Sequence, residues 1–206
     1  MPKSPKAPLT LPEYERIFRM IHGLLLNEDC DPSKACNYFA IIGAALVSKH
    51  HRLTAIPQAG AAAYNLGLPG NKVIAYGRID DGRLISDERA FHAWTLIDNW
   101  IVDFSAPLFQ GPNIRPKMFQ RIRSGISPNP GQLDVKGSFG HATNSDLTNM
   151  LWEDFQSFSM NMDLFSIATD WYRPPPKKVF YSIPIADAFG KTTEVKLSPV
   201  LLVGAW

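Results

Sequence analysis

The chain has 206 residues, of which 45% are hydrophobic and 19% are charged. This length and composition allow one well-buried core, so we expect a single domain. The 21 basic and 19 acidic residues leave a net charge of +2 without a lysine or arginine run, which argues against a nucleic-acid partner. No apolar stretch approaches the roughly 18 residues of a spanning helix and no signal-like segment follows the start, so we expect a cytoplasmic protein without a membrane partner.

The first predicted element is a helix that starts at a capping box, Thr10-Leu11-Pro12-Glu13. Apolar residues then recur at helical spacing to about Leu26. Residues 1–9 are rich in proline and lysine and are expected to form a flexible tail. We therefore expect one domain over residues 10–206.

A second helix is predicted from about Ser33 to His50, with Asp31 or Ser33 as its cap. Cys36 falls in its first turn. Helix N-termini stabilise anions, so a thiol there is favoured as a nucleophile, although a cysteine in an apolar helix is ordinarily an inert small hydrophobe. Gly43 and the alanines after it are small, as expected where a helix lies close against a sheet.

Strand patterns follow the two helices. Residues 53–64 and 72–78 have the composition of strands in an antiparallel sheet, and residues 91–103 form an alternating pair of strands. Helices first and strands after them indicate an α+β fold.

The segment 91–103 carries the most information in the chain. Its two strands meet at Asp98-Asn99, and a two-residue turn there fixes the register so that Ile97 pairs with Trp100. In this register His92 and Asp103 are diagonal neighbours, roughly 7–8 Å apart at Cα, and the carboxylate can accept the imidazole N–H.

The hairpin has two different faces. The face opposite His92 is nearly all apolar and is expected to pack on the core, whereas the His92 and Asp103 face is expected to look elsewhere. Each residue also has a simpler reading: His92 as a core histidine bonded to the backbone, and Asp103 as a cap of the turn at 105–107. Their joint placement on one face favours a shared chemical role.

Thiol, imidazole and carboxylate occur here in chain order as a possible nucleophile, base and orienting group. The strand His92-Ala93-Trp94, followed by Trp100-Ile101-Val102-Asp103, resembles the transglutaminase-like motif, and the Cys36 helix resembles that superfamily's nucleophile helix. The resemblance covers roughly residues 31–105, with 110–178 as an elaboration.

The resemblance implies the papain-like fold shared by papain-type proteases, transglutaminases and arylamine N-acetyltransferases. It makes Cys36 the nucleophile, His92 the base and Asp103 the orienting carboxylate. The chain also resembles an uncharacterised bacterial family known only as a domain of unknown function with a papain-like fold. It departs from papain-type enzymes where they carry a glutamine before the cysteine, because Asn27 is the amide available in that stretch. The Cys36 backbone N–H is a second candidate oxyanion donor.

Other residues are candidates for a substrate groove or a metal site. Trp94 and Trp152 are candidates to line a substrate groove, although tryptophans most often supply buried area. A zinc site from Cys30, Cys36 and His92 lacks paired-ligand spacing, so we expect no metal and no cofactor. His141 is expected in an exposed loop.

The second half of the chain is less regular. We expect a short helix at 115–123, a loop at 127–131, a helix at 146–158 and an edge strand at 179–185.

The sequence therefore predicts a cysteine-dependent acyl-transfer enzyme that acts on a peptide, an amide or a small acyl substrate. The alternative is a catalytically inactive module on the same fold that binds a peptide or protein. The sequence indicates no particular oligomeric state.

Overall fold

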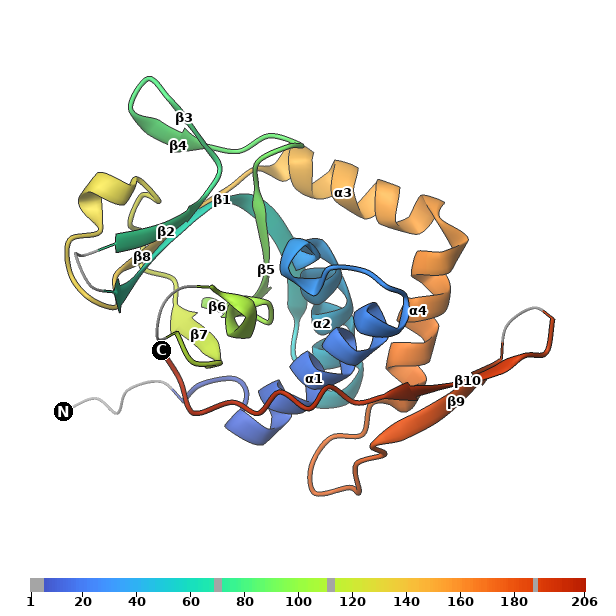
Figure 1. Cartoon of the computed structure of the whole chain (residues 1–206). Helices are drawn as coiled ribbons and strands as arrows, with labels where there is room; N and C mark the ends of the chain where they lie inside the picture. Colours follow the sequence, from blue (N-terminus) through green and yellow to red (C-terminus); the bar gives the residue numbers. More distant parts are fainter. Residues whose placement is uncertain (1–5, 69–71, 111–113, 187–188) are drawn as a thin grey trace.

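The computed structural model describes residues 6–68, 72–110, 114–186 and 189–206. Helices come first, a curled sheet follows, and a second helical pair and a C-terminal hairpin complete the chain (Figure 1). The helices and strands are α1 (Leu11–Asn27), α2 (Cys36–His51), β1 (Ala55–Leu68), β2 (Lys72–Tyr76), β3 (Arg78–Asp80), β4 (Arg83–Ile85), β5 (His92–Ile97), β6 (Trp100–Asp103), β7 (Phe119–Ile122), β8 (Phe139–Thr143), α3 (Ser145–Ser157), α4 (Ser159–Trp171), β9 (Ser182–Ala186) and β10 (Thr192–Lys196). Short 3₁₀ helices cover Pro32–Lys34, Ala106–Leu108 and Pro130–Gln132.

Helix α1 begins where its capping box predicts. The Thr10 backbone N–H donates to Glu13 Oε2 over 2.7 Å, which satisfies one of the free donors at the helix start. The expected tail is shorter than residues 1–9, because Leu9 is buried in the core and the Gln120 side-chain amide donates to its carbonyl. Residues 1–5 of that tail lie outside the described part of the chain.

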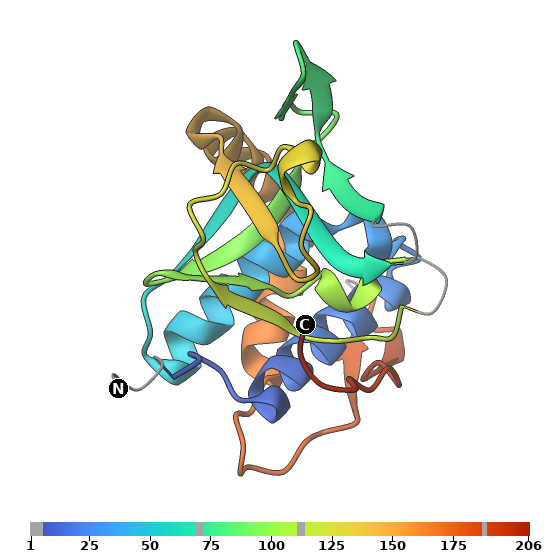
Figure 2. The same cartoon turned by 90° about the vertical axis from the view of Figure 1, so that its left-hand side faces the viewer.

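The main sheet is antiparallel and curls into a half-barrel (Figure 2). Its strand order is β2-β1-β5-β6-β7, and β8 also pairs with β1. One core lies between the sheet and helices α1, α2 and α4, and a second core of aromatic and aliphatic side chains lies within the curl. The α+β class expected from the element order is confirmed.

The long strand β1 pairs with three other strands. Gly60 lies opposite His92 of β5 and opposite Thr143 of β8. A Cβ atom at Gly60 would lie 2.0 Å from the carbonyl oxygen of Ala142, so glycine permits the close approach of β8 at the point where β5 begins.

Strands β2 and β5 pair with consecutive stretches of β1. β2 ends with Tyr76 opposite Ala62, and β5 begins with His92 opposite Gly60. The chain between them leaves the sheet to form the small β3–β4 hairpin (Figure 1). This break brings Tyr76 and His92 side by side.

The predicted register of the β5–β6 hairpin is confirmed, because Ile97 pairs with Trp100 across a turn in which Asp98 has a φ of 50°. The expectation for its second face was incomplete. Trp94 and Ile101, on the same face as His92, pack in the second core, so both faces of this hairpin are buried. A curled sheet encloses its inner face, and the end of that face at His92 lines a cavity.

The second half differs from expectation in places. The predicted helix at 115–123 is strand β7, because its residues pair with the free edge of β6. The helix predicted at 146–158 is α3, and α4 follows it without having been predicted. The expected edge strand is β9, in which Pro184 lies opposite Glu194 of β10.

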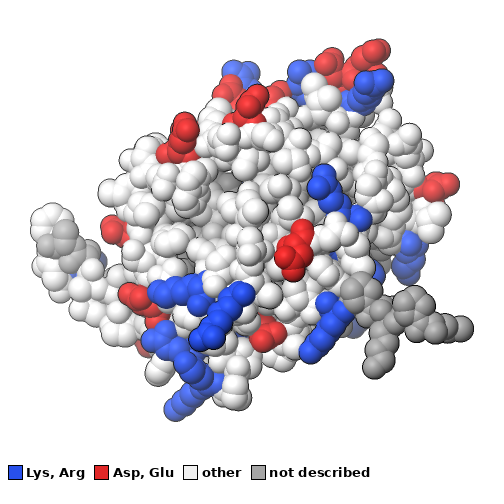
Figure 3. Space-filling model, turned by 180° about the vertical axis from the view of Figure 1, so that it is seen from behind, with Lys and Arg blue, Asp and Glu red and all other residues white. Residues whose placement is uncertain are grey.

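Among the described residues no helix is long and apolar enough to cross a membrane. The face seen in Figure 3 carries charged side chains of both signs around a broad uncharged area.

Candidate functional site

Cys36 is the first residue of α2 and is half-buried. The helix begins three residues later than predicted, because Asp31 caps the preceding 3₁₀ turn instead, where its Oδ1 accepts the Ser33 backbone N–H over 3.1 Å. The start of α2 has no side-chain cap. Backbone N–H groups in a first helical turn lack partners within the helix, so the peptide N–H of Cys36 is a free donor beside its own sulfur.

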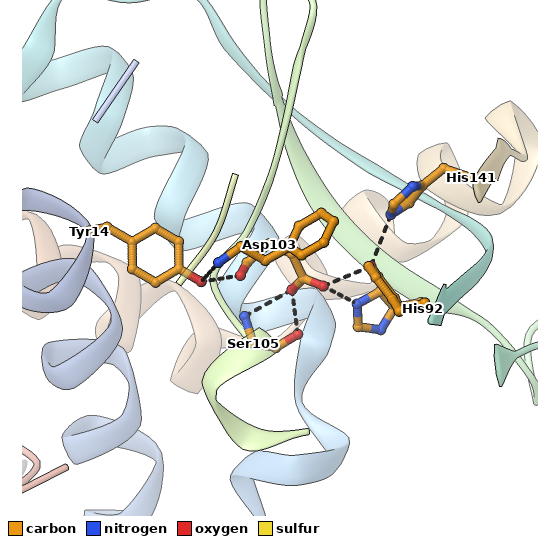
Figure 4. Close-up of polar contacts among 7 residues, drawn as sticks. Tyr14, His92, Asp103, Ser105 and His141 are labelled. Carbon is orange, nitrogen blue, oxygen red and sulfur yellow. Dashed lines mark hydrogen bonds and ion pairs between the residues drawn. The ribbon is translucent and has the colours of Figure 1, made fainter. Parts of the chain in front are cut away.

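His92 and Asp103 are in direct contact, as the hairpin register predicted. His92 Nε2 and Asp103 Oδ2 are 2.7 Å apart, and both side chains are almost fully buried (Figure 4). With Nε2 held by the carboxylate, Nδ1 is the ring nitrogen left to exchange a proton with another group.

Asp103 is held by several donors. Oδ1 accepts the Ser105 backbone N–H over 3.0 Å and the Ser105 hydroxyl over 2.7 Å. Oδ2 accepts the Tyr64 hydroxyl over 2.8 Å in addition to His92, and the Asp103 carbonyl accepts from Tyr14. The carboxylate therefore both caps the turn and orients the histidine, one oxygen for each task.

The pair is charged in the folded protein. Burial alone would lower the pKa of His92, but the Asp103 carboxylate, and then the Cys36 side chain, raise it to about 10. Burial would raise the pKa of Asp103, but His92 and the hydrogen bonds from Ser105 and Tyr64 hold it below its ordinary value.

A cavity of about 470 Å³ joins the two groups, since both Cys36 and His92 line it. Tyr76 stacks on the His92 ring with centroids 4.4 Å apart and also lines the cavity. Ser105, Leu108 and Phe109 contribute further to its wall. Cys36, His92 and Ser105, which bonds to Asp103, therefore line one space large enough for a small substrate or a side chain.

The hydrogen bonds around Asp103 extend through Tyr64 to His141. His141 lies on β8 rather than in an exposed loop, and its Nε2 is 2.9 Å from the Tyr64 hydroxyl (Figure 4). The alternation of Phe139, His141 and Thr143 is the signal that could have placed His141 on the inner face of a strand.

The hydrogen bonds fix the tautomer of His141. The Tyr64 hydroxyl has one proton and gives it to the carboxylate of Asp103, so His141 Nε2 must donate to the tyrosine oxygen. Burial, with a further contribution from the charge of His92, lowers the pKa of His141 to about 3. His141 is therefore a neutral member of the network at neutral pH.

The other candidates are not among the residues that line this cavity. The Asn27 amide donates to Glu28 at the end of α1 and does not line the cavity. Trp94 is 0% exposed and packs in the second core, so it is a core residue and not a groove residue. Trp152 is 37% exposed and lines a different cavity, of about 360 Å³, beside α2 and β1.

Cys30 is remote from this site in its contacts, because its sulfur lies 3.6 Å from the Glu28 carbonyl and its side chain packs against the core of α1 and α2. In the described part of the chain, no group of three His, Cys, Asp or Glu side chains is arranged to hold a metal ion.

The fold and the site define an α+β protein in which the start of a helix and a buried His–Asp pair meet at one cavity of a half-barrel sheet. The model of a protein family described as "Protein of unknown function (DUF2026)" matches residues 10–206, and the chain belongs to this family. It is also similar to a solved structural genomics protein, at 31% sequence identity and a TM-score of 0.86, over 99% of this chain and 100% of the other. No curated protein matches the sequence.

Proposed function

We propose that this protein is a cysteine-dependent acyl-transfer enzyme of papain-like, transglutaminase-like fold. The observation that carries the proposal is that Cys36, at a helix start, and His92, already bound to a buried Asp103, line the same cavity. A nucleophile, a base and an orienting carboxylate are the three groups that such chemistry requires.

In the proposed reaction, the Cys36 thiolate attacks the carbonyl carbon of an amide or ester. The negative charge that develops on the carbonyl oxygen is stabilised by the backbone N–H of Cys36 and the start of α2. The tetrahedral adduct then collapses, the C–N or C–O bond breaks, and the His92 imidazolium gives its proton to the leaving group. The product of this half-reaction is a thioester on Cys36.

The second half-reaction returns the enzyme to its starting state. Neutral His92 removes a proton from water or an amine as that group attacks the thioester, and the acyl group leaves Cys36 as an acid or a new amide. The thiolate and the imidazolium are thereby restored. Asp103 keeps the Nε2 proton of His92 in place throughout and stabilises the charged ring.

The test is to trap the acyl-enzyme. The protein is mixed with p-nitrophenyl acetate, nitrophenol release is followed by absorbance, and intact-protein and peptide mass spectrometry locate the added acetyl group. We expect acetylation of Cys36 in preference to Cys30, and its loss in Cys36→Ser and His92→Gln. Cys30→Ser is the matched control and should acetylate like the wild-type protein.

A different pattern of acetylation would contradict the proposal. Equal, slow acetylation of both thiols in the wild-type protein would contradict the enzyme and would favour the alternative, a module on the same fold that binds a peptide or protein.

A further inference from the structure

The cavity beside Cys36 has a one-sided charge. Lys34 and Arg89 both line it, and the described residues of its lining include no aspartate or glutamate. The two cations come from distant parts of the chain, since Lys34 ends the 3₁₀ turn before α2 and Arg89 lies between β4 and β5. Folding therefore brings the two cations to one cavity.

The ion pairs of the nearby carboxylates leave the Arg89 guanidinium out and include Lys34 only at an exposed position. Asp87 pairs with Arg78 over 2.8 Å and caps its own turn by accepting the Arg89 backbone N–H over 2.9 Å. Among the described residues, no carboxylate forms an ion pair with the Arg89 guanidinium. Lys34 pairs with the exposed Asp31 at 3.4 Å, and such surface pairs are weak.

Two other features of the cavity also favour an anion. The start of α2 presents free N–H groups, which carry the positive end of the helix dipole. The wall also holds aromatic side chains, including Tyr76, Phe91 and Phe109. An apolar wall lowers the local dielectric and strengthens the attraction between these positive groups and an anion.

We propose that the substrate carries a carboxylate, which Arg89 and Lys34 hold while Cys36 reacts with its acyl carbon. This assignment rests on the proposed function and adds its substrate class: an acidic acyl compound with an apolar portion against Tyr76 and Phe109. Arginine suits this task because its planar guanidinium can bind a carboxylate through two parallel hydrogen bonds.

The experiment compares two alkylating reagents of nearly equal size, anionic iodoacetate and neutral iodoacetamide. Second-order rates at Cys36 are measured by mass spectrometry in a Cys30→Ser background, and the ratio of the iodoacetate rate to the iodoacetamide rate is the readout. Dividing by the iodoacetamide rate removes any general change in thiol reactivity.

We expect Arg89→Gln and Lys34→Gln each to lower this ratio about two- to fivefold, because each removes one unit charge from the lining of the partly solvated cavity that Cys36 also lines. Raising the salt concentration to 0.5 M should lower the wild-type ratio and shrink the difference between the variants, since the charges are screened.

Lys49→Gln is the matched control. Lys49 lies near the far end of α2 and, like Lys34, has one exposed ion-pair partner, Asp170 at 3.9 Å. Its substitution should leave the ratio unchanged. Equal ratios in the wild type, Arg89→Gln and Lys34→Gln would overturn the acidic-substrate assignment, whereas failure of Cys36 to acylate in the earlier test would overturn the enzyme itself.

Discussion

Asp103 carries the largest concentration of polar contacts in the site. Its Oδ1 caps the turn through Ser105, and its Oδ2 accepts hydrogen bonds from His92 and Tyr64. Capping the turn and orienting the histidine are alternatives in the sequence, but in the structure each role has its own oxygen. A single substitution therefore affects both the stability of the turn and the charge of the histidine, and the two effects need separate measurements.

We expect Asp103→Asn to lower the alkylation rate of Cys36 by iodoacetamide at pH 7 at least about tenfold, because loss of the carboxylate lowers the pKa of His92. Asp103→Ala should do the same and should also reduce the free energy of unfolding by about 3–5 kcal/mol, since it leaves His92, Ser105 and Tyr64 without their buried acceptor.

The control for this prediction is Asp98→Asn in the exposed turn of the same hairpin, which should change neither quantity. Lowered stability with unchanged alkylation would limit Asp103 to its capping role. Urea unfolding and alkylation rates measured on the same preparations separate these results.

At the scale of the elements, helix α2 carries Cys36 to the cavity that His92 lines, and the β5–β6 hairpin joins His92 to Asp103. The helix can approach the sheet closely because Gly43 faces Phe104, and a Cβ atom there would lie 2.4 Å from Phe104 Cδ2. Phe104 is buried against Tyr14 and directly follows Asp103, so the contact links the middle of α2 to the carboxylate.

We expect Gly43→Ala to destabilise the protein by about 1–3 kcal/mol through overpacking. Helix propensity alone predicts a gain of about 1 kcal/mol. The sign of the change in the free energy of unfolding, measured by urea unfolding, therefore shows whether the contact with Phe104 outweighs helix propensity. Gly131→Ala is the matched control, because a Cβ atom there would lie 3.6 Å from Asn129 Oδ1, an ordinary contact. A net gain in stability from Gly43→Ala would show that the Phe104 ring yields easily.

The elements differ in how well their sequences predict them. The register of β5 and β6 follows from one two-residue turn, so the contact between His92 and Asp103 could be derived from local sequence. Strand β7 could not, because the short segment 115–123 becomes a strand only by pairing with β6. The burial of Trp94 could not be predicted from local sequence either. An alternating pattern shows which residues share a face of the strand, but it does not show whether that face packs in a second core or lines a cavity.

At the scale of the whole molecule, stability should depend on pH through two histidines with opposite pKa shifts, the buried His92 and the half-buried His141. The folded pKa of His92 is raised to about 10, so its contribution is complete below its ordinary value of 6.5 and is lost as the pH rises toward 10. The folded pKa of His141 is lowered to about 3, so its contribution is complete above 6.5 and is lost as the pH falls toward 3.

We therefore expect the free energy of unfolding to be greatest near neutral pH and to fall on both sides, with a slope of up to about 1.4 kcal/mol per pH unit for each histidine. His141→Gln should flatten the acidic side and His92→Gln the alkaline side. Burial lowers the pKa of His22, His50 and His51 as well, so the acidic side should be reduced but not abolished in His141→Gln. Urea unfolding between pH 4 and 9 measures both slopes, and parallel curves for the wild type and His141→Gln would contradict this account.

The interruption between β2 and β5 separates the residues that we propose for the chemistry from those that we propose to bind the substrate. The chain leaves β1 opposite Ala62 and returns opposite Gly60, and the excursion in between supplies Arg89 and Phe91 to the cavity wall. Leu84 is its buried anchor. A relative could therefore exchange this excursion, keeping one apolar anchor, and acquire a different ligand preference while its thiol, imidazole and carboxylate stay where they are.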